Sequence, residues 1–294
     1  MEIETKLHSA ISKFLTEFEK RHNINLIFVC EASSRPQQIH VDDSDFDLKG
    51  LFLPNPEDCL KIIPKILTHY QIFHNKIRID SKEYDVDINF YDLKEFSRQK
   101  LNSENQIGHF DFSFFSPNVY LDKFPHLMQR IREKLFPIPS EFYSSFKGLT
   151  DFLLKSKDKN KLFPNKKLLC SLVAGVYFFH VCIFDEFPFY SVWEELEYLK
   201  NRLDFLVEKN KISLKDKSML EQIFQLIEFY FIQKKEKGRI STSLKIFDIQ
   251  LNFSSWLLEK FEEKLMERKK NGFTLDFFQS ICDEIMLSTD WKKK

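Results

Sequence analysis

The sequence has no excess charge of either sign, because 44 lysines and arginines balance 44 aspartates and glutamates. A neutral chain has no global positive field to attract nucleic acid. A polyanion would have to be held by a local patch or through a metal ion. The six lysines from Lys155 to Lys167 form the main candidate patch, but few aromatic side chains accompany them for base stacking, so a solvated loop and helix start is the favoured interpretation.

No CxxC pair occurs among the five cysteines, which removes the usual signature of a zinc site and favours reduced thiols in a cytoplasmic protein. The N-terminal residues include no apolar run of the kind found in signal peptides, so none is expected. The most apolar stretch, residues 168–184, contains Ser171, Gly175 and His180 and is short for a bilayer of about 30 Å. We expect no membrane span and a buried helix at this position.

The apolar pattern changes character along the chain, and we predict an α+β fold in two domains. Residues 1–135 are expected to form a small mixed β-sheet domain, and residues 136–294 an all-α domain in which helical periodicity dominates. The expected elements of the first domain are a helix from Ile3 to about His22, strands at 24–30 and 46–53, a helix at 57–75, a hairpin over 78–93 turning at Asp80-Ser81, and a helix from Asp92.

Acidic residues cluster in VDDSDFDLKG, residues 41–50, which places four aspartates in six positions. Asp45 and Asp47 are two residues apart on a predicted strand, so their side chains point the same way from Cα atoms about 7 Å apart. Asp85 and Asp87 share a face of another predicted strand, and either can supply a third carboxylate. Such a set suits two divalent cations about 4 Å apart, as in phosphoryl-transfer sites, whereas an isolated acidic turn is usually just solvated.

Three segments resemble a known family, and they occur in the family's order: EASSRPQQIHVDDSDFDLKG, DINFYDLK and SPNVY. Polymerase-β-type nucleotidyltransferases have a strand, a Gly-Ser turn, about ten residues and then Asp-hydrophobic-Asp. Here Ser33-Ser34 and Asp45-Phe46-Asp47 fall at that spacing. The segments resemble most closely the RNA repair pathway DNA polymerase β family over about residues 26–120. The positions that match this family's motif are Glu31, Ser34, Arg35, Asp43, Ser44, Asp45 and Asp47, with Phe46 and Lys49 as conservative replacements.

The resemblance implies a Mg²⁺-dependent nucleotidyltransferase domain, with Mn²⁺ as an alternative metal, that moves an NMP from an NTP to an acceptor hydroxyl and releases pyrophosphate. The acceptor would be RNA, protein or a small molecule. The roles it implies are metal binding by Asp45, Asp47 and Asp87; catalysis by these three and Arg35, with Asp87 also the base; nucleotide binding by Ser33, Ser34, Arg35 and Lys49; and support of the loop by Glu31 and Asp92.

Histidines are weaker candidates. His40 and His109 are expected at most at the rim of the site, and the spacing of His69 and His74 does not suit a metal pair on one helix face.

A second interpretation stays open because the family's glycine is replaced by Ser33 and its Ala-Trp-Gly by Pro36-Gln37-Gln38. Glycine permits a positive φ and a close approach of backbone N–H groups to phosphate, which a Cβ atom crowds. The chain would then be a pseudoenzyme of the same fold that binds nucleotide or regulates a protein partner.

Overall fold

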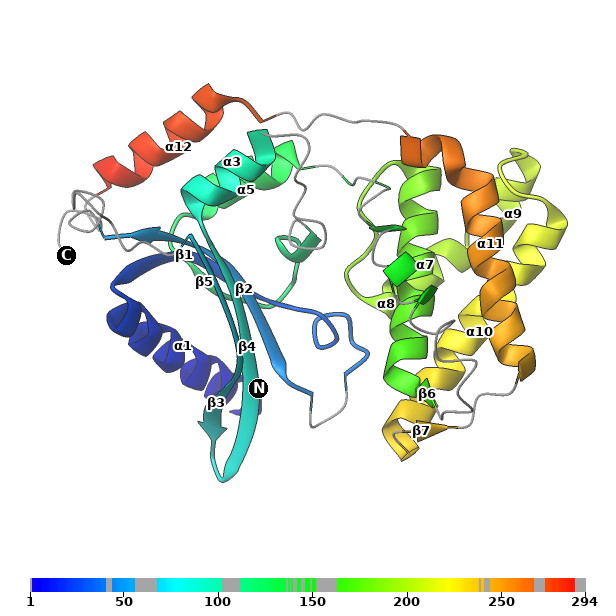
Figure 1. Cartoon of the computed structure of the whole chain (residues 1–294), viewed down its shortest axis with the longest axis horizontal. Helices are drawn as coiled ribbons and strands as arrows, with labels where there is room; N and C mark the ends of the chain where they lie inside the picture. Colours follow the sequence, from blue (N-terminus) through cyan, green and yellow to red (C-terminus); the bar gives the residue numbers. More distant parts are fainter. Residues whose placement is uncertain are drawn as a thin grey trace. The chain divides into compact units, whose positions relative to one another are not determined.

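The computed structural model describes residues 2–40, 44–55, 68–101, 112–135, 163–237, 239–240, 244–266 and 273–288, together with part of 137–151 (Figure 1). The chain forms two compact units. Unit 1 comprises residues 1–135 and 270–294 and contains a five-stranded sheet; unit 2 comprises residues 136–269 and is built mainly of helices. The α+β fold class is therefore confirmed.

The sheet of unit 1 is mixed, with strand order β3-β4-β2-β1-β5. The central strands β1 (Ile24–Ala32) and β2 (Phe46–Pro54) are antiparallel, and β4 (Lys82–Asp92) runs parallel to β2. At the edges, β3 (His69–Ile79) forms a hairpin with β4, and β5 (Val119–Asp122) pairs with β1. Every residue of β1 is buried, as its apolar run predicts.

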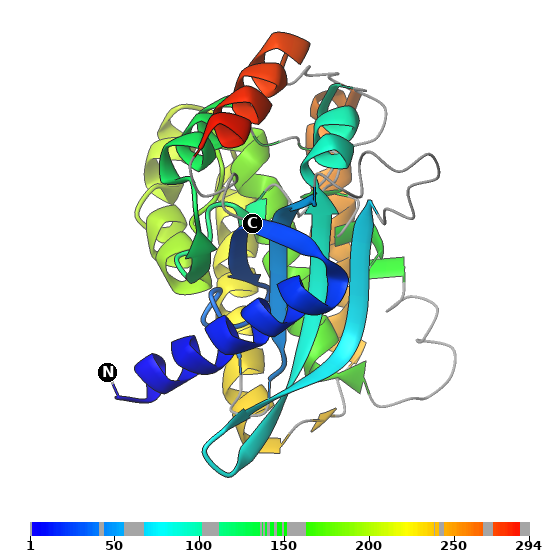
Figure 2. The same cartoon turned by 90° about the vertical axis from the view of Figure 1, so that its left-hand side faces the viewer.

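Helix α1 (Glu2–His22) lies across one face of the sheet, as Figure 2 shows. Its apolar stripe of Ile11, Leu15 and Phe18 packs in one core with strand side chains, which in β2 and β4 come from even-numbered positions such as Phe46 and Val86. Because side chains alternate along a strand, the neighbouring odd positions face the other side. Helices α3 (Leu93–Leu101) and α5 (Pro125–Lys134) lie on that other side of the sheet (Figure 1).

Helix α12 (Leu275–Leu287) returns the end of the described chain to unit 1. The Phe96 ring of α3 makes edge contacts with Phe273 and Phe278, and Arg130 of α5 binds Ser280 and Glu284. The sequence pattern placed this helix with the C-terminal helices, because its periodicity shows an apolar face but not the surface that covers it.

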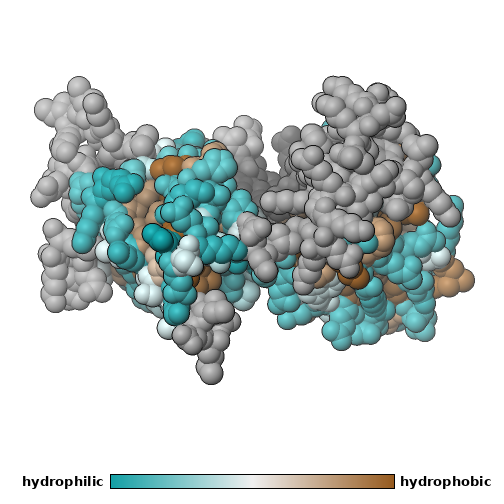
Figure 3. All heavy atoms as spheres, turned by 90° about the horizontal axis from the view of Figure 1, so that it is seen from below, coloured by the Kyte–Doolittle hydropathy of each residue, from teal (hydrophilic) through white to brown (hydrophobic). Residues whose placement is uncertain are grey.

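Unit 2 contains α7 (Asn165–Phe184), α8 (Val192–Lys200), α9 (Leu203–Glu208), α10 (Leu214–Lys237) and α11 (Leu244–Met266), with a short pairing of β6 (Phe163–Pro164) and β7 (Arg239–Ile240). Most of α7 is buried, as predicted for residues 168–184. None of the helices searched in the described part of the chain is sufficiently long and apolar to span a bilayer. The described surface in Figure 3 is largely hydrophilic, with smaller hydrophobic areas on both units.

The first helix, the strands at 24–30 and 46–53, the hairpin at Asp80-Ser81 and the helix after Asp92 are confirmed. The helix predicted for 57–75 is wrong from His69 onward, where the chain forms β3. Tyr70 and Ile77 are seven residues apart, as on one face of a helix, and both are buried because a bulge between Ile72 and Asn75 shifts the phase of the strand. Residues 56–67, 41–43 (with Asp43), His109 and the side chains of the basic patch lie outside the described residues.

Candidate metal and nucleotide site

Asp45, Asp47 and Asp87 bring three carboxylates together on one face of the sheet. Asp47 lies directly opposite Asp87 in the parallel pair β2–β4, and Asp45 precedes β2. One carboxylate oxygen from each residue lies within 4.8 Å of the other two, and all three residues are partly buried. The structure therefore gathers the three residues that the sequence suggested as metal ligands.

A bulge in β3 determines which residue of β4 supplies the third carboxylate. The backbone N–H of His74, at φ 59°, donates to Oδ1 of Asp87 over 2.8 Å and so fixes this carboxylate. The other candidate, Asp85, has its Oδ1 only 2.6 Å from Nζ of Lys76. Asp87 thus belongs to the carboxylate group, whereas Asp85 forms an ion pair on the hairpin.

The environment of Asp47 concentrates negative charge. Burial raises the pKa of Asp47, and the nearby charges of Asp45 and Asp87 raise it further. A hydrogen bond from Ser33 and the positive charge of Lys49 act in the opposite direction. Lys49 follows two residues after Asp47 on β2, so it shares the face of the carboxylates. A divalent cation would relieve the repulsion that raises this pKa.

The turn after β1 holds Ser33 in the left-handed conformation, with φ 63°. Backbone hydrogen bonds close the turn, from the N–H of Gln38 to the carbonyl of Arg35 over 2.8 Å and from that of Ile39 to Ser34 over 2.9 Å. A serine here thus adopts the conformation for which glycine is the default residue. The Ser33 side chain lowers the pKa of Asp47, and Ser34 is buried.

Arg35 ties this turn to the start of β2. Its Nε and Nη2 atoms donate to the Ser44 carbonyl over 3.2 and 2.8 Å, and its Cζ atom lies 3.9 Å from the centroid of the Phe46 ring. Phe46 belongs to the core beneath α1, so these contacts lie on the face opposite the carboxylates. The structure therefore places Arg35 where it positions the residue before Asp45.

Glu31 connects two of the motifs noted in the sequence. Its Oε2 accepts hydrogen bonds from Asn118 Nδ2 over 3.0 Å and from Tyr120 Oη over 2.8 Å, and both donors belong to SPNVY. Burial raises the pKa of Glu31, although those hydrogen bonds and Arg35 oppose the rise. Sequence reasoning missed the roles of Asn118 and Tyr120; the resemblance of SPNVY was the signal that could have identified them.

The remaining candidate residues, Asp92, His69 and His40, lie outside the carboxylate group. Asp92 accepts from the N–H of Lys94 over 3.0 Å at the start of α3. His69 bonds Asn89 over 2.7 Å and stacks on Tyr91. His40 lines a separate cavity.

A family model covers the sheet, the turn after β1 and the three carboxylates. Residues 7–149 match the model of the RNA repair pathway DNA polymerase beta family, which this part of the chain resembles. No curated protein matches the chain. A solved structure, a nucleotidyltransferase-like protein from Exiguobacterium sibiricum 255-15, is 11% identical and covers 98% of this chain and 86% of that chain, with a TM-score of 0.28. A TM-score this low supports no conclusion about this chain.

Proposed function

We propose that the protein is a Mg²⁺-dependent nucleotidyltransferase that moves an NMP from an NTP to an acceptor hydroxyl. The observation that carries the proposal is the meeting of Asp45, Asp47 and Asp87, with ligand oxygens within 4.8 Å of one another. The family match supplies the reaction class. An acidic group alone would not distinguish this chemistry from a solvated surface.

The donor set fits a hard divalent cation. Carboxylate oxygens are the ligands that Mg²⁺ and Mn²⁺ prefer, and burial together with the neighbouring Asp45 and Asp87 raises the pKa of Asp47. Asp45, Asp47 and Asp87 would hold the metal. When bound, Mg²⁺ supplies neutralisation of the charge on the NTP phosphates and on the departing pyrophosphate.

The reaction requires a base, a held triphosphate and a departing pyrophosphate. The acceptor oxygen forms a bond to the α-phosphorus while the bond from that phosphorus to the β-phosphate oxygen breaks, and the acceptor proton passes to Asp87. The N–H of His74 fixes one oxygen of Asp87 and so orients the other. Lys49 and the backbone donors of Ser33 and Ser34 bind the phosphates. Arg35 acts through the Ser44 carbonyl, by positioning Asp45.

RNA, a protein and a small molecule are all candidate acceptors. The balance of 44 basic and 44 acidic residues argues against long nucleic acid, because phosphate contacts supply most of that affinity. A short RNA end or a protein partner is compatible with the chain's neutrality. The reaction is proposed to take place in the cytoplasm, where reduced thiols such as buried Cys30 persist.

One observation favours the alternative of a pseudoenzyme. Ser33 adds a Cβ and a hydroxyl at the turn where phosphate would approach, and its side chain interacts with Asp47. If the added side chain closes the site, the protein keeps the fold and serves as a nucleotide-binding or regulatory module.

Transfer of label tests the proposal. Each NTP, labelled at the α-phosphate, is incubated with Mg²⁺ or Mn²⁺ and with the protein alone, total RNA or a cell extract, and label transfer and pyrophosphate are measured. We expect transfer by the wild type and a loss of about a hundredfold or more for Asp47→Asn, the scale of one catalytic group.

Asp85→Asn is the matched control, because it removes a carboxylate from the same strand face but one that is paired with Lys76. The activity of this variant should stay within about threefold of the wild type, because a substitution away from the reacting groups usually has a small effect. Binding of NTP with Mg²⁺ but no transfer to any acceptor would favour the pseudoenzyme.

A further inference from the structure

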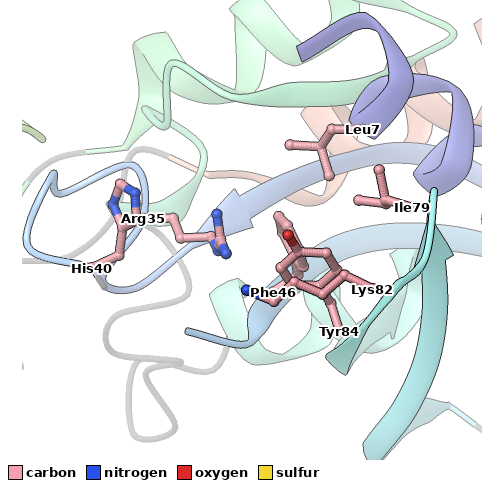
Figure 4. Close-up of a pocket in the computed structure, with 7 residues that line it drawn as sticks. All are labelled: Leu7, Arg35, His40, Phe46, Ile79, Lys82 and Tyr84. Atoms are coloured by element: carbon pink, nitrogen blue, oxygen red, sulfur yellow. The ribbon is translucent and has the colours of Figure 1, made fainter. Parts of the chain in front are cut away.

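A cavity of about 310 Å³ lies in unit 1 on the face of the sheet that α1 covers, opposite the carboxylates (Figure 4). Its lining comes from α1, the turn after β1, the start of β2 and the β3–β4 hairpin. No step of the proposed reaction uses this cavity. Its volume equals that of roughly ten water molecules in the liquid, so it suits a small ligand.

All the charged residues among those that line the cavity are basic: Arg35 and Lys82. Both cations lie against aromatic rings, with Arg35 Cζ 3.9 Å from the Phe46 centroid and Lys82 Nζ 4.8 Å from the Tyr84 centroid. Two hydrogen bonds to the Ser44 carbonyl also fix the plane of the guanidinium. Because Arg35 is held in place before a ligand arrives, it binds an anion with little loss of side-chain entropy.

The rest of the wall offers apolar and aromatic surface. Leu7 of α1 and Ile79 of β3 lie on one side of the cavity, next to the Tyr84 ring (Figure 4). A planar apolar group attached to the anion would bury surface against these side chains. An inorganic anion without such a group would leave this apolar surface exposed to water.

We propose that this cavity binds a small organic anion, a phosphate monoester or carboxylate carried on a planar apolar group. The anionic group lies with Arg35 and Lys82, and the apolar group lies against Tyr84, Leu7 and Ile79. The site is separate from the carboxylate face, and its binding needs no divalent cation.

Calorimetric titration tests this site without Mg²⁺, with phenyl phosphate, benzoate and inorganic phosphate as separate probes. We expect one of the two aromatic anions to bind, and to bind about tenfold more tightly than inorganic phosphate, a difference of about 1.4 kcal/mol. The comparison of phenyl phosphate with benzoate identifies which anionic group the site prefers. No heat with either aromatic anion at millimolar concentration would overturn the proposal.

Lys82→Ala should weaken binding about tenfold, because it removes one of the two cations. Arg78→Ala is the matched control on the same hairpin, since Arg78 pairs with Glu83 and Lys82 with Ile79, which places the two cations on opposite faces. Both side chains are exposed, so neither change should disturb folding. Equal losses of affinity in the two variants would show that only the overall charge matters, and they would refute the proposed binding site.

Leu7→Trp provides an independent test that changes no charge. Leu7 is partly exposed on α1 and lines the cavity, so a larger side chain fills it and should abolish binding of the aromatic anion. Unchanged binding would count against the site. Asp47→Asn should leave the titration unaltered, so this proposal and the proposed nucleotidyltransferase activity can fail separately.

Discussion

The side chain of Ser33 interacts with the carboxylate of Asp47 and lowers its pKa, while the backbone of Ser33 holds a left-handed φ of 63°. The residue that departs from the family's glycine therefore keeps the glycine's backbone conformation. It also adds a donor that lowers the pKa of Asp47 against the larger effect of burial.

Ser33→Gly should change nucleotide affinity by less than about tenfold, or 1.4 kcal/mol. Glycine can adopt the same left-handed backbone and keeps the N–H donors of the turn, so the backbone contacts to phosphate should survive the change. The measurement is calorimetric titration of both proteins with a non-hydrolysable NTP and Mg²⁺.

Ser33→Ala is the control, because it keeps the Cβ atom and removes only the hydroxyl. If the Cβ atom closes the site, the wild type and the alanine variant bind no NTP and only the glycine variant does. That pattern would contradict the proposed enzyme and favour the pseudoenzyme.

Much of unit 1 follows from local sequence, because the pattern of apolar residues is strong there. The alternation of Asp85, Asp87 and Asn89 with Val86, Ile88 and Phe90 predicts the face of every residue in β4, and burial agrees. The pattern leaves Asp85 and Asp87 equivalent, however. The bulge in β3 and the ion pair of Lys76 with Asp85 distinguish them, and both depend on pairing between strands.

Other features depend on contacts between distant segments. The hydrogen bond from Arg35 to the Ser44 carbonyl cannot be predicted from the spacing of charged residues, because its acceptor is a backbone atom. The return of α12 to unit 1 depends on Phe96 and Arg130, which lie far from it in sequence. The resemblance to the family identified the region of the candidate site. The structure then showed which residues of that region contact one another.

Gly50→Ala should destabilise the protein strongly. A Cβ atom at Gly50 would overlap the carbonyl oxygen of Phe28 and lie 3.0 Å from Cγ2 of Val29, so the central strands would have to separate. We expect a loss of about 2–4 kcal/mol in the free energy of unfolding, measured in urea.

Gly148→Ala is the matched control for Gly50, because the residue is helical and, within the described part of the chain, nothing outside its own helix lies within 4 Å of the Cβ position. It should be neutral or stabilising by up to about 1 kcal/mol. Equal losses at the two glycines would refute the steric explanation.

Glu31 should make the stability of the protein pH-dependent. Its pKa is raised in the folded state, chiefly by burial, so the folded protein keeps this proton where the unfolded chain has released it. Its contribution to stability is complete below the ordinary pKa and is lost as pH rises through the raised one. Glu31→Gln should flatten the dependence, measured by urea unfolding between about pH 4 and 7. Parallel curves for the two proteins would contradict this assignment.

Asp47→Asn should abolish the thermal stabilisation that Mg²⁺ and an NTP give. Ligands that bind only the folded state raise its stability by mass action, by about 2.7 kcal/mol at a hundred times Kd. The variant removes one of the three carboxylates, and the apo protein should stay folded because repulsion among the three is reduced. Melting curves with Mg²⁺ alone, NTP alone and both separate metal binding from nucleotide binding. Asp85→Asn, whose carboxylate is paired with Lys76, should keep the full shift. A shift that survives in Asp47→Asn but disappears in Asp85→Asn would place the metal on the hairpin and remove the basis of the proposed reaction.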